Sequence, residues 1–323
     1  MIISRTPFRL SFAGGGTDLL QFHCEEEGAV LSTALNKYMY ITVNKRFDET
    51  LRLSYSKTEI HSSVRNIEHP ILKYILSKYK PDGGLEIISM ADIPSGTGLG
   101  SSSSFTVGVL NALKKYLKLQ PSPEQLAREA CDIEINRLGE PIGKQDQYIA
   151  AYGGLQFIRF QPKGQVLVEP VNCSANTKVK LKSSCLLFFT GLTRDSKSVL
   201  KEQSEKTNMK RDVLREMAAI AKKMKLVLER DDNLDLFGNL LHEAWVLKKS
   251  MASNISNPRI DEWYDRAKRA GALGGKILGA GSGGFLMLFC EPSKQVAVTQ
   301  ELKELKPFQV EFENQGSQII FEG

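Results

Sequence analysis

The sequence has few of the residues that cross-link a chain or bind metal ions. Its 323 residues include five cysteines and four histidines. The cysteines are scattered, odd in number and without C-x-x-C spacing, so neither a disulfide framework nor a zinc site is expected. The histidines show no metal-ligand spacing and no paired nucleophile. The residues concerned are Cys24, Cys131, Cys173, Cys185 and Cys290, and His23, His61, His69 and His242.

Long apolar runs and blocks of like charge are also missing. No stretch reaches the roughly 18–20 apolar residues that a membrane span needs, and residues 1–16 lack the pattern of a secretory signal. The net charge of +6 is spread along the chain, without a basic arm for nucleic acid. We therefore expect a cytoplasmic protein that binds neither membranes nor nucleic acids. The mild positive charge suits an anionic small substrate.

Strand and helix patterns are mixed along the chain without the regular alternation of a parallel sheet, which predicts an α+β fold. The length allows two domains that share a cleft. A polar, turn-rich segment over residues 162–176 places the domains at 1–170 and 171–323. Strands are predicted near residues 8–12, 38–43, 85–90, 155–160, 186–190, 285–290 and 310–321, and helices near 105–117, 122–137 and 213–227.

The segment Pro94–Ser104, hereafter the glycine–serine loop, lies between a predicted strand and a predicted helix. Gly96, Gly98 and Gly100 remove side chains where the backbone can approach a ligand closely. Backbone N–H groups of the loop and of the following helix can then surround an anion. The loop lacks the Gly-Lys-Ser/Thr of a Walker A motif. We predict that it binds the phosphates of a nucleotide; the alternative is a flexible linker.

A second glycine loop, Gly279–Gly284, formally matches G-x-G-x-x-G. The pattern of a dinucleotide-binding fold leads into a helix, whereas this run leads into an apolar strand. We interpret it as a tight backbone loop that borders a ligand.

Glu134 falls on or beside the apolar stripe of its predicted helix, because it follows Leu126 by eight residues and Ala130 by four. A carboxylate in that position is costly unless it is paired or binds a metal ion. The alternative is an ion pair with Arg137 or Arg128 at the helix edge.

Three further charged residues are candidates whose ordinary interpretations stay open. Arg9 alternates with apolar residues on the first predicted strand and could be an edge-strand arginine. Asp18 follows a triple glycine and could cap a helix. Asp146 lies in a polar segment, 143–147, and could be a loop aspartate.

Taken together, these segments resemble the GHMP kinases, the superfamily of galactokinase, homoserine kinase, mevalonate kinase and phosphomevalonate kinase. Three motifs carry the resemblance in the family's order: residues 7–18 (PFRLSFAGGGTD), the glycine–serine loop, and residues 276–285. Asp146 falls where the family keeps its catalytic aspartate. The resemblance spans nearly the whole chain. It implies a two-domain fold with a ribosomal protein S5 domain 2-like N-terminal part and a ferredoxin-like C-terminal part.

The resemblance implies an enzyme, an ATP-dependent phosphotransferase with an alcohol group as acceptor. Asp146 would accept the hydroxyl proton or steady the alkoxide, and Arg9 would stabilise developing charge. Ser102 and Glu134 would hold Mg²⁺. The residues implied to bind ATP are Pro94, Gly96, Thr97, Gly98, Leu99, Gly100, Ser101, Ser102 and Ser103.

The first motif is implied to bind the sugar, through Gly14, Gly15, Gly16, Thr17 and Asp18. Galactokinases carry Glu-His where this chain has Gly15-Gly16, and the lost acid and added space suit a larger or anionic substrate. The pattern most resembles the heptose 7-phosphate kinases of the family. These enzymes convert D-glycero-D-manno-heptose 7-phosphate into the 1,7-bisphosphate, on the way to nucleotide-activated heptose for bacterial surface glycans such as lipopolysaccharide or capsule.

A distal phosphate on that substrate would need cationic or N–H donors. Arg5, Lys144 and Arg194 are the candidates, each with a surface ion pair as the alternative, and Gly281 is expected to border the substrate. Rival functions are a fucokinase-like kinase of an unphosphorylated sugar, a non-catalytic ATP and sugar sensor, and an isoprenoid kinase. The sequence leaves monomer and homodimer equally open.

Overall fold

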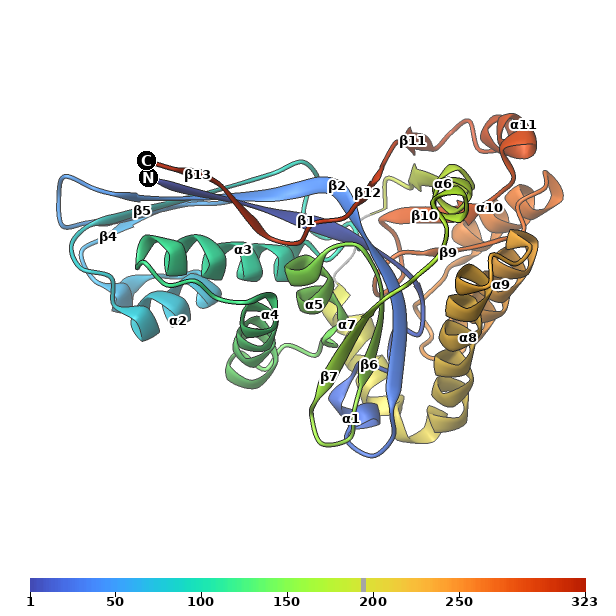
Figure 1. Cartoon of the computed structure of the whole chain (residues 1–323), viewed down its shortest axis with the longest axis horizontal. Coiled ribbons are helices and arrows are strands. Elements are labelled where there is room, and N and C mark those ends of the chain that lie inside the picture. Colours follow the sequence, from blue (N-terminus) through green and yellow to red (C-terminus); the bar gives the residue numbers. More distant parts are fainter. Residues whose placement is uncertain (193–195) are drawn as a thin grey trace.

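The protein is described by a computed structural model that covers residues 1–192 and 196–323. Helices and strands are mixed in both halves of these residues, which confirms the α+β prediction (Figure 1). The first half contains β1 (Ile2–Ala13), α1 (Leu20–His23), β2 (Gly28–Lys45), β3 (Leu51–Ser54), β4 (Thr58–His61), α2 (Pro70–Tyr79), β5 (Leu85–Ala91), α3 (Ser101–Tyr116), α4 (Pro123–Cys131), α5 (Gln145–Tyr152), β6 (Leu155–Phe160) and β7 (Val166–Pro170).

The second half continues with shorter strands and longer helices. It contains α6 (Ala175–Ser183), β8 (Cys185–Phe189), α7 (Ser196–Lys206), α8 (Arg211–Glu229), α9 (Leu234–Lys249), α10 (Pro258–Arg269), β9 (Gly274–Ile277), β10 (Phe285–Phe289), α11 (Gln295–Glu301), β11 (Lys306–Phe308), β12 (Phe312–Glu313) and β13 (Gln318–Glu322). No helix in the described residues is long and apolar enough to cross a membrane.

Within the described residues the larger sheet has nine strands, in the order β13-β1-β2-β5-β3-β4, with β6 and β12 also paired to β2. β2 is 18 residues long, beyond the predicted 38–43, because its two ends pair with different strands. Residues 28–33 pair with β6 and residues 39–45 with β5. The predicted alternation on β1 is real, yet both of its faces are buried near Arg9 and Ser11. β13 pairs with residues 2–5 of β1. Arg9 itself pairs with β2, and its N–H donates to the carbonyl oxygen of Leu99 at 3.1 Å, so the glycine–serine loop covers the strand at this point.

α3 and α5 pack against β1 and β2 of this sheet, and α8 also packs against β2 (Figure 1). A capping box formed by Ser122 and Gln125 starts α4. The helix predicted over 122–137 changes form on the way, because α4 ends at Cys131 and Asp132–Arg137 winds as a π-helix. Wide turns of this kind recur at functional sites, and this one carries Glu134.

The second sheet runs β11-β8-β10-β9 and lies between two apolar cores. Successive β10 side chains point to opposite faces. Phe285, Met287 and Phe289 join the core shared with the larger sheet, α8 and α9. Leu286 and Leu288 join a smaller core that includes Trp245 and Trp263.

The end of the chain returns to the sheet of the first half. β13 pairs antiparallel with β1, and β12 pairs with β2. Buried Ser317 fixes this return, since its hydroxyl accepts from the Asn111 amide at 3.0 Å and shares a 2.7 Å hydrogen bond with Thr6. The predicted boundary between residues 170 and 171 stays a prediction, but residues 312–322 belong structurally to the first sheet.

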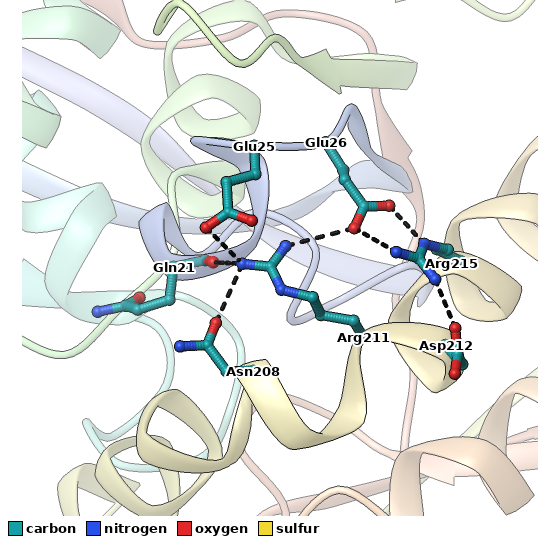
Figure 2. Close-up of polar contacts among 7 residues, drawn as sticks. All are labelled: Gln21, Glu25, Glu26, Asn208, Arg211, Asp212 and Arg215. Carbon is teal, nitrogen blue, oxygen red and sulfur yellow. Dashed lines mark hydrogen bonds and ion pairs between the residues drawn. The ribbon is translucent and has the colours of Figure 1, made fainter.

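A charged network joins the turn after α1 to the start of α8 (Figure 2). Both oxygens of Glu26 accept from Arg215, at 2.6 and 2.8 Å, and one also accepts from Arg211 at 3.3 Å. Arg211 additionally pairs with Glu25 at 3.0 Å. The network therefore anchors the segment that follows the triple glycine to the second half of the chain.

Candidate active site

A central cavity of about 940 Å³ lies where the two halves meet. Its wall combines the end of β1, the glycine–serine loop, the second glycine loop, the start of α5 and parts of α7, α9 and β9. Segments far apart in the sequence thus converge on one space, which is the usual setting of a ligand site between two parts of a protein.

The glycine–serine loop lies on this wall and leads directly into α3. Gly96, Gly98 and Gly100 all have left-handed φ angles, of 77°, 82° and 77°, which residues with a Cβ adopt only under strain. No side chain caps the first turn of α3. Its N–H groups, together with the positive end of the helix, therefore favour an anion at the cavity wall.

The second glycine loop packs against the first, backbone to backbone. A Cβ on Gly279 would lie 2.7 Å from the Cα of Gly98, and one on Gly284 would lie 2.3 Å from the carbonyl oxygen of Thr97. The loop leads into β10, as predicted. Gly281 lines the cavity at a φ of 106°, and a Cβ there would lie 2.5 Å from the Ile255 carbonyl oxygen. Glycine is thus required at both loops because their backbones touch.

Arg9 and Asp146 form a two-pronged ion pair on the cavity wall. Nε and one terminal nitrogen of Arg9 each donate to one carboxylate oxygen, both at 2.7 Å. The remaining guanidinium nitrogen donates to the carbonyl oxygen of Gly98 at 2.6 Å, which ties the pair to the glycine–serine loop. Asp146 lies in the first turn of α5, where the helix dipole favours a carboxylate. Paired parallel hydrogen bonds of this kind are strong and fix the orientation of both groups.

Glu134 is buried directly behind Ser102, which lines the cavity. Its oxygens accept from the Ser102 hydroxyl at 2.9 Å and from the Gln147 amide at 2.7 Å. Burial raises the pKa of Glu134 to about 7, against these hydrogen bonds. The alternative ion pair is not formed, since Arg137 pairs with Asp132 and Glu134 forms none of the ion pairs among the described residues. Because Ser102 and Gln147 are both neutral, the charge of the Glu134 carboxylate remains available to a cation.

Asp18 lines the same cavity and is held by backbone donors. Its carboxylate accepts from the N–H of Gly16 at 2.8 Å and of Gln145 at 3.2 Å. Burial raises its pKa, and neighbouring Asp146 adds to the effect. Gly143 makes the position possible, because a Cβ there would lie 1.9 Å from the Asp18 carboxylate. This fixed acceptor is suited to hydroxyl groups of a bound molecule.

The structure does not bring every nominated residue to the cavity. Thr17 is fully buried, with its hydroxyl bonded to the backbone of Gly14 and Ala29. Arg5 lies outside the cavity, its guanidinium 4.5 Å from the ring centre of Tyr38.

Other nominated residues lie behind the wall or elsewhere. Thr97 and Leu99 are buried behind the glycine–serine loop. Lys144 lines a separate cavity of about 700 Å³ beside Arg128 and Tyr148. Arg194 lies outside the described residues.

Several cavity residues were not predicted from the sequence. Lys248 on α9 and Lys276 on β9 are buried cations in the wall, and Ser11, Gln145 and Gln203 are polar groups beside them. The sequence does indicate that Lys248 is buried, because it extends the apolar stripe that carries Leu241, Ala244 and Trp245. That pattern is the one by which Glu134 was found.

Comparison with known proteins shows which family has this sequence pattern. The N-terminal domain of the GHMP kinases matches residues 50–154, and their C-terminal domain matches residues 220–307. A D-glycero-alpha-D-manno-heptose 7-phosphate kinase from Campylobacter jejuni is 32% identical over 96% of each chain. The chain belongs to the GHMP kinases. It is a phosphotransferase that acts on an alcohol group, as the sequence predicted.

Two further relatives of this GHMP kinase are informative. The crystal structure of a D-glycero-D-manno-heptose 1-phosphate kinase from Bacteroides thetaiotaomicron superposes with a TM-score of 0.83, at 26% identity over the whole of both chains. An L-fucokinase/L-fucose-1-P guanylyltransferase from Bacteroides fragilis is 26% identical over 95% of this chain and 36% of that protein. The first confirms the predicted two-domain GHMP kinase fold along the full length.

Proposed function

We propose that this GHMP kinase is an ATP-dependent sugar 1-kinase that converts D-glycero-D-manno-heptose 7-phosphate into the 1,7-bisphosphate. The observation that carries the proposal is the fixed Arg9–Asp146 pair, which lies between an uncapped glycine loop and the Asp18 pocket. An anion site and a hydroxyl-binding site thus share one cavity, with charged groups between them. The similarity to heptose phosphate kinases supports the choice of sugar.

The nucleotide half is the glycine–serine loop with the start of α3. Its backbone N–H groups would bind the triphosphate of ATP at the uncapped helix end. Ser102 and Glu134 would hold Mg²⁺, which favours oxygen ligands and needs only one or two carboxylates alongside substrate phosphates. Their fit rests on a buried carboxylate whose partners among the described residues are neutral donors. Bound there, the cation would neutralise charge on the phosphates.

The half of the cavity that would bind the sugar is the part lined by Asp18, Gly15 and Gly16. The anomeric hydroxyl would be directed at Asp146, with Asp18 accepting from ring hydroxyls. As the sugar oxygen bonds to the γ-phosphorus, the bond to the β-phosphate oxygen breaks and ADP leaves. Asp146 accepts the hydroxyl proton, and Arg9 stabilises the charge that develops beside it. An anomeric hydroxyl is more acidic than an ordinary alcohol, which makes the proton easier for Asp146 to accept.

The test is an ADP-release assay with Mg²⁺-ATP against a sugar panel, followed by NMR of the product. The panel contains heptose 7-phosphate, heptose 1-phosphate, the unphosphorylated heptose and L-fucose. We expect heptose 7-phosphate to give the highest kcat/KM and a product phosphorylated at the anomeric carbon. Preference for L-fucose or for heptose 1-phosphate would overturn the proposal.

A further inference from the structure

The central cavity contains two buried ammonium groups that phosphoryl transfer, as described above, does not use. Lys248 comes from α9 and Lys276 from β9, and each side chain is only 6% exposed. Both line the same cavity as Asp18. A buried ammonium is strongly unfavourable without an anionic partner, so the two lysines require an explanation.

The described residues offer these two ammonium groups few hydrogen-bond acceptors. Nζ of Lys248 donates to the carbonyl oxygen of Gly15 at 3.2 Å and to Oε1 of Gln203 at 2.7 Å, both of which are neutral. Within the described residues the Lys276 ammonium forms no hydrogen bond or ion pair. Burial lowers the pKa of Lys276 to about 7, with Lys248 and Arg9 adding to the effect, and burial lowers that of Lys248 to about 8.

Two other groups on this wall also lack partners among the described residues. They are the hydroxyl of Ser11 and the amide nitrogen of Gln203, both buried and both in residues that line the cavity. An ammonium can only donate, so the Gln203 oxygen faces Lys248 and its NH₂ group is left to donate elsewhere. Several donors on the wall are therefore left without an acceptor among the described residues.

Positive charge is in excess close to the two lysines, although Asp92 and Glu140 also line the cavity. Arg9 and Asp146 compensate each other through their paired hydrogen bonds. Asp18 is the carboxylate that acts on both lysines, and it raises the pKa of both. One carboxylate against two ammonium groups leaves a positive site, which matches a ligand carrying its own negative charge.

We propose that Lys248 and Lys276, with the amide of Gln203, bind the phosphate that the sugar already carries, away from the reacting hydroxyl. This assignment rests on the proposed function, and it replaces Arg5 and Lys144, which lie outside the central cavity. Lys248 and Lys276 thereby become the residues that select a phosphorylated sugar.

The glycine pair of the first motif fits this assignment. A Cβ on Gly16 would lie 2.2 Å from the amide nitrogen of Gln203. Any side chain there would displace Gln203, which holds Lys248 in place. The loss of the galactokinase Glu-His pair at Gly15-Gly16 thus opens space for the lysine site.

The experiment compares Lys248→Met, Lys276→Met and the control Lys249→Met. Lys249 lies on the same helix but pairs with Asp261 at 3.0 Å. Each variant is assayed at saturating ATP with heptose 7-phosphate and with the unphosphorylated heptose. We expect either cavity variant to raise KM for the sugar phosphate roughly 10- to 100-fold, the usual weight of a hydrogen bond to a charged group. KM for ATP, KM for the unphosphorylated heptose and all kcat values should change by less than about threefold.

Calorimetric titration with heptose 7-phosphate, without ATP, measures the same loss independently of catalysis. Lys248→Gln serves as a second variant at α9, and melting temperatures confirm folding. Equal effects on both sugars, or none, would overturn the lysine site while the proposed function stands. If the wild type prefers a different sugar phosphate and the lysine variants lose it selectively, the site stands and the heptose is wrong. A wild type that accepts only unphosphorylated sugars overturns both.

Discussion

At the residue scale, the chemistry of this kinase depends on side chains that are expensive to bury and are buried nonetheless. Arg9 and Asp146 are 137 positions apart and meet through two hydrogen bonds of 2.7 Å. Glu134, Asp18, Lys248 and Lys276 are each less than a tenth exposed. Residues placed against their own solvation preference are where function concentrates.

Asp146→Asn tests the catalytic pair. The amide keeps the size of the side chain but removes the charge and the ability to take a proton. We expect kcat to fall roughly 10²- to 10⁴-fold, the usual range for a positioned acid or base, with KM for ATP changed little. Single-turnover ADP release measures this. ADP release at the wild-type rate would show that the carboxylate is not needed.

Lys276→Met tests how much the buried ammonium destabilises the fold, from the free energy of unfolding at several pH values. Lys276 is faced by Lys248, Arg9 and Asp18, and its pKa is lowered to about 7 in the folded protein. Between pH 7 and its unfolded pKa near 10.5 the unfolded chain binds more protons at this site, so its contribution to stability rises with pH. We expect the variant to be more stable than wild type at pH 7.

The difference in the free energy of unfolding between the two proteins should then narrow from pH 7 to pH 9, as wild-type Lys276 loses its proton. Urea unfolding at several pH values measures it, and groups that are common to both proteins cancel. A difference that does not vary with pH would show that folding does not lower the pKa of Lys276.

At the scale of elements, the active site is a contact between two backbone loops rather than between side chains. A Cβ on Gly98 would lie 2.3 Å from the carbonyl oxygen of Leu278, and Gly98 also offers its own carbonyl to Arg9. The uncapped end of α3 and the π-helical turn that carries Glu134 adjoin this contact. Local geometry at helix ends therefore sets the place of the anion site.

Gly98→Ala is expected to separate the loops. A left-handed φ costs about 1 kcal/mol for alanine, and the clash with Leu278 adds to it, so KM for ATP should rise at least tenfold. Gly164→Ala is the matched control, because its φ is +84° and a Cβ there has nothing within 4 Å. Steady-state kinetics and melting temperatures separate strain from clash. Equal effects of the two variants would contradict the loop contact.

At the scale of the whole molecule, the two halves are tied together on both sides of the cavity. The chain end pairs with β1 at one side. At the other, the network of Glu26 with Arg211 and Arg215 joins the segment after the triple glycine to α8 (Figure 2). Since α7 and α8 are adjacent, this network also fixes the helix that carries Gln203.

Glu26→Gln should weaken that connection. The hydrogen bonds with Arg215 lower the pKa of Glu26, so its contribution is present above pH 4.5 and is lost as the pH falls below it. Partly exposed pairs contribute about 0.2–1 kcal/mol each, so we expect a loss of about 1 kcal/mol at pH 7 that shrinks in high salt. Asp212→Asn, which affects only exposed Asp212 beside Arg215, should lose less. Chemical unfolding at low and high salt measures both, and equal losses would contradict the network.

The sequence by itself determined the α+β class, the positions of most strands, the two glycine loops and the buried place of Glu134. Each of these follows from local pattern: alternation, helical spacing, caps, or glycine where φ must be positive. Such patterns are properties of neighbouring residues, and they needed no tertiary contacts to be found.

Only the tertiary structure decided which charges share a cavity. Arg5 and Lys144 carry the right charge near the right motifs, yet the strand and helix that hold them point them elsewhere. Lys248 and Lys276 come from a helix and a strand of the second half and meet Asp18 of the first. Burial and the partners of a charge depend on contacts between distant segments, and these fix the face of the cavity that the proposed sugar phosphate would meet.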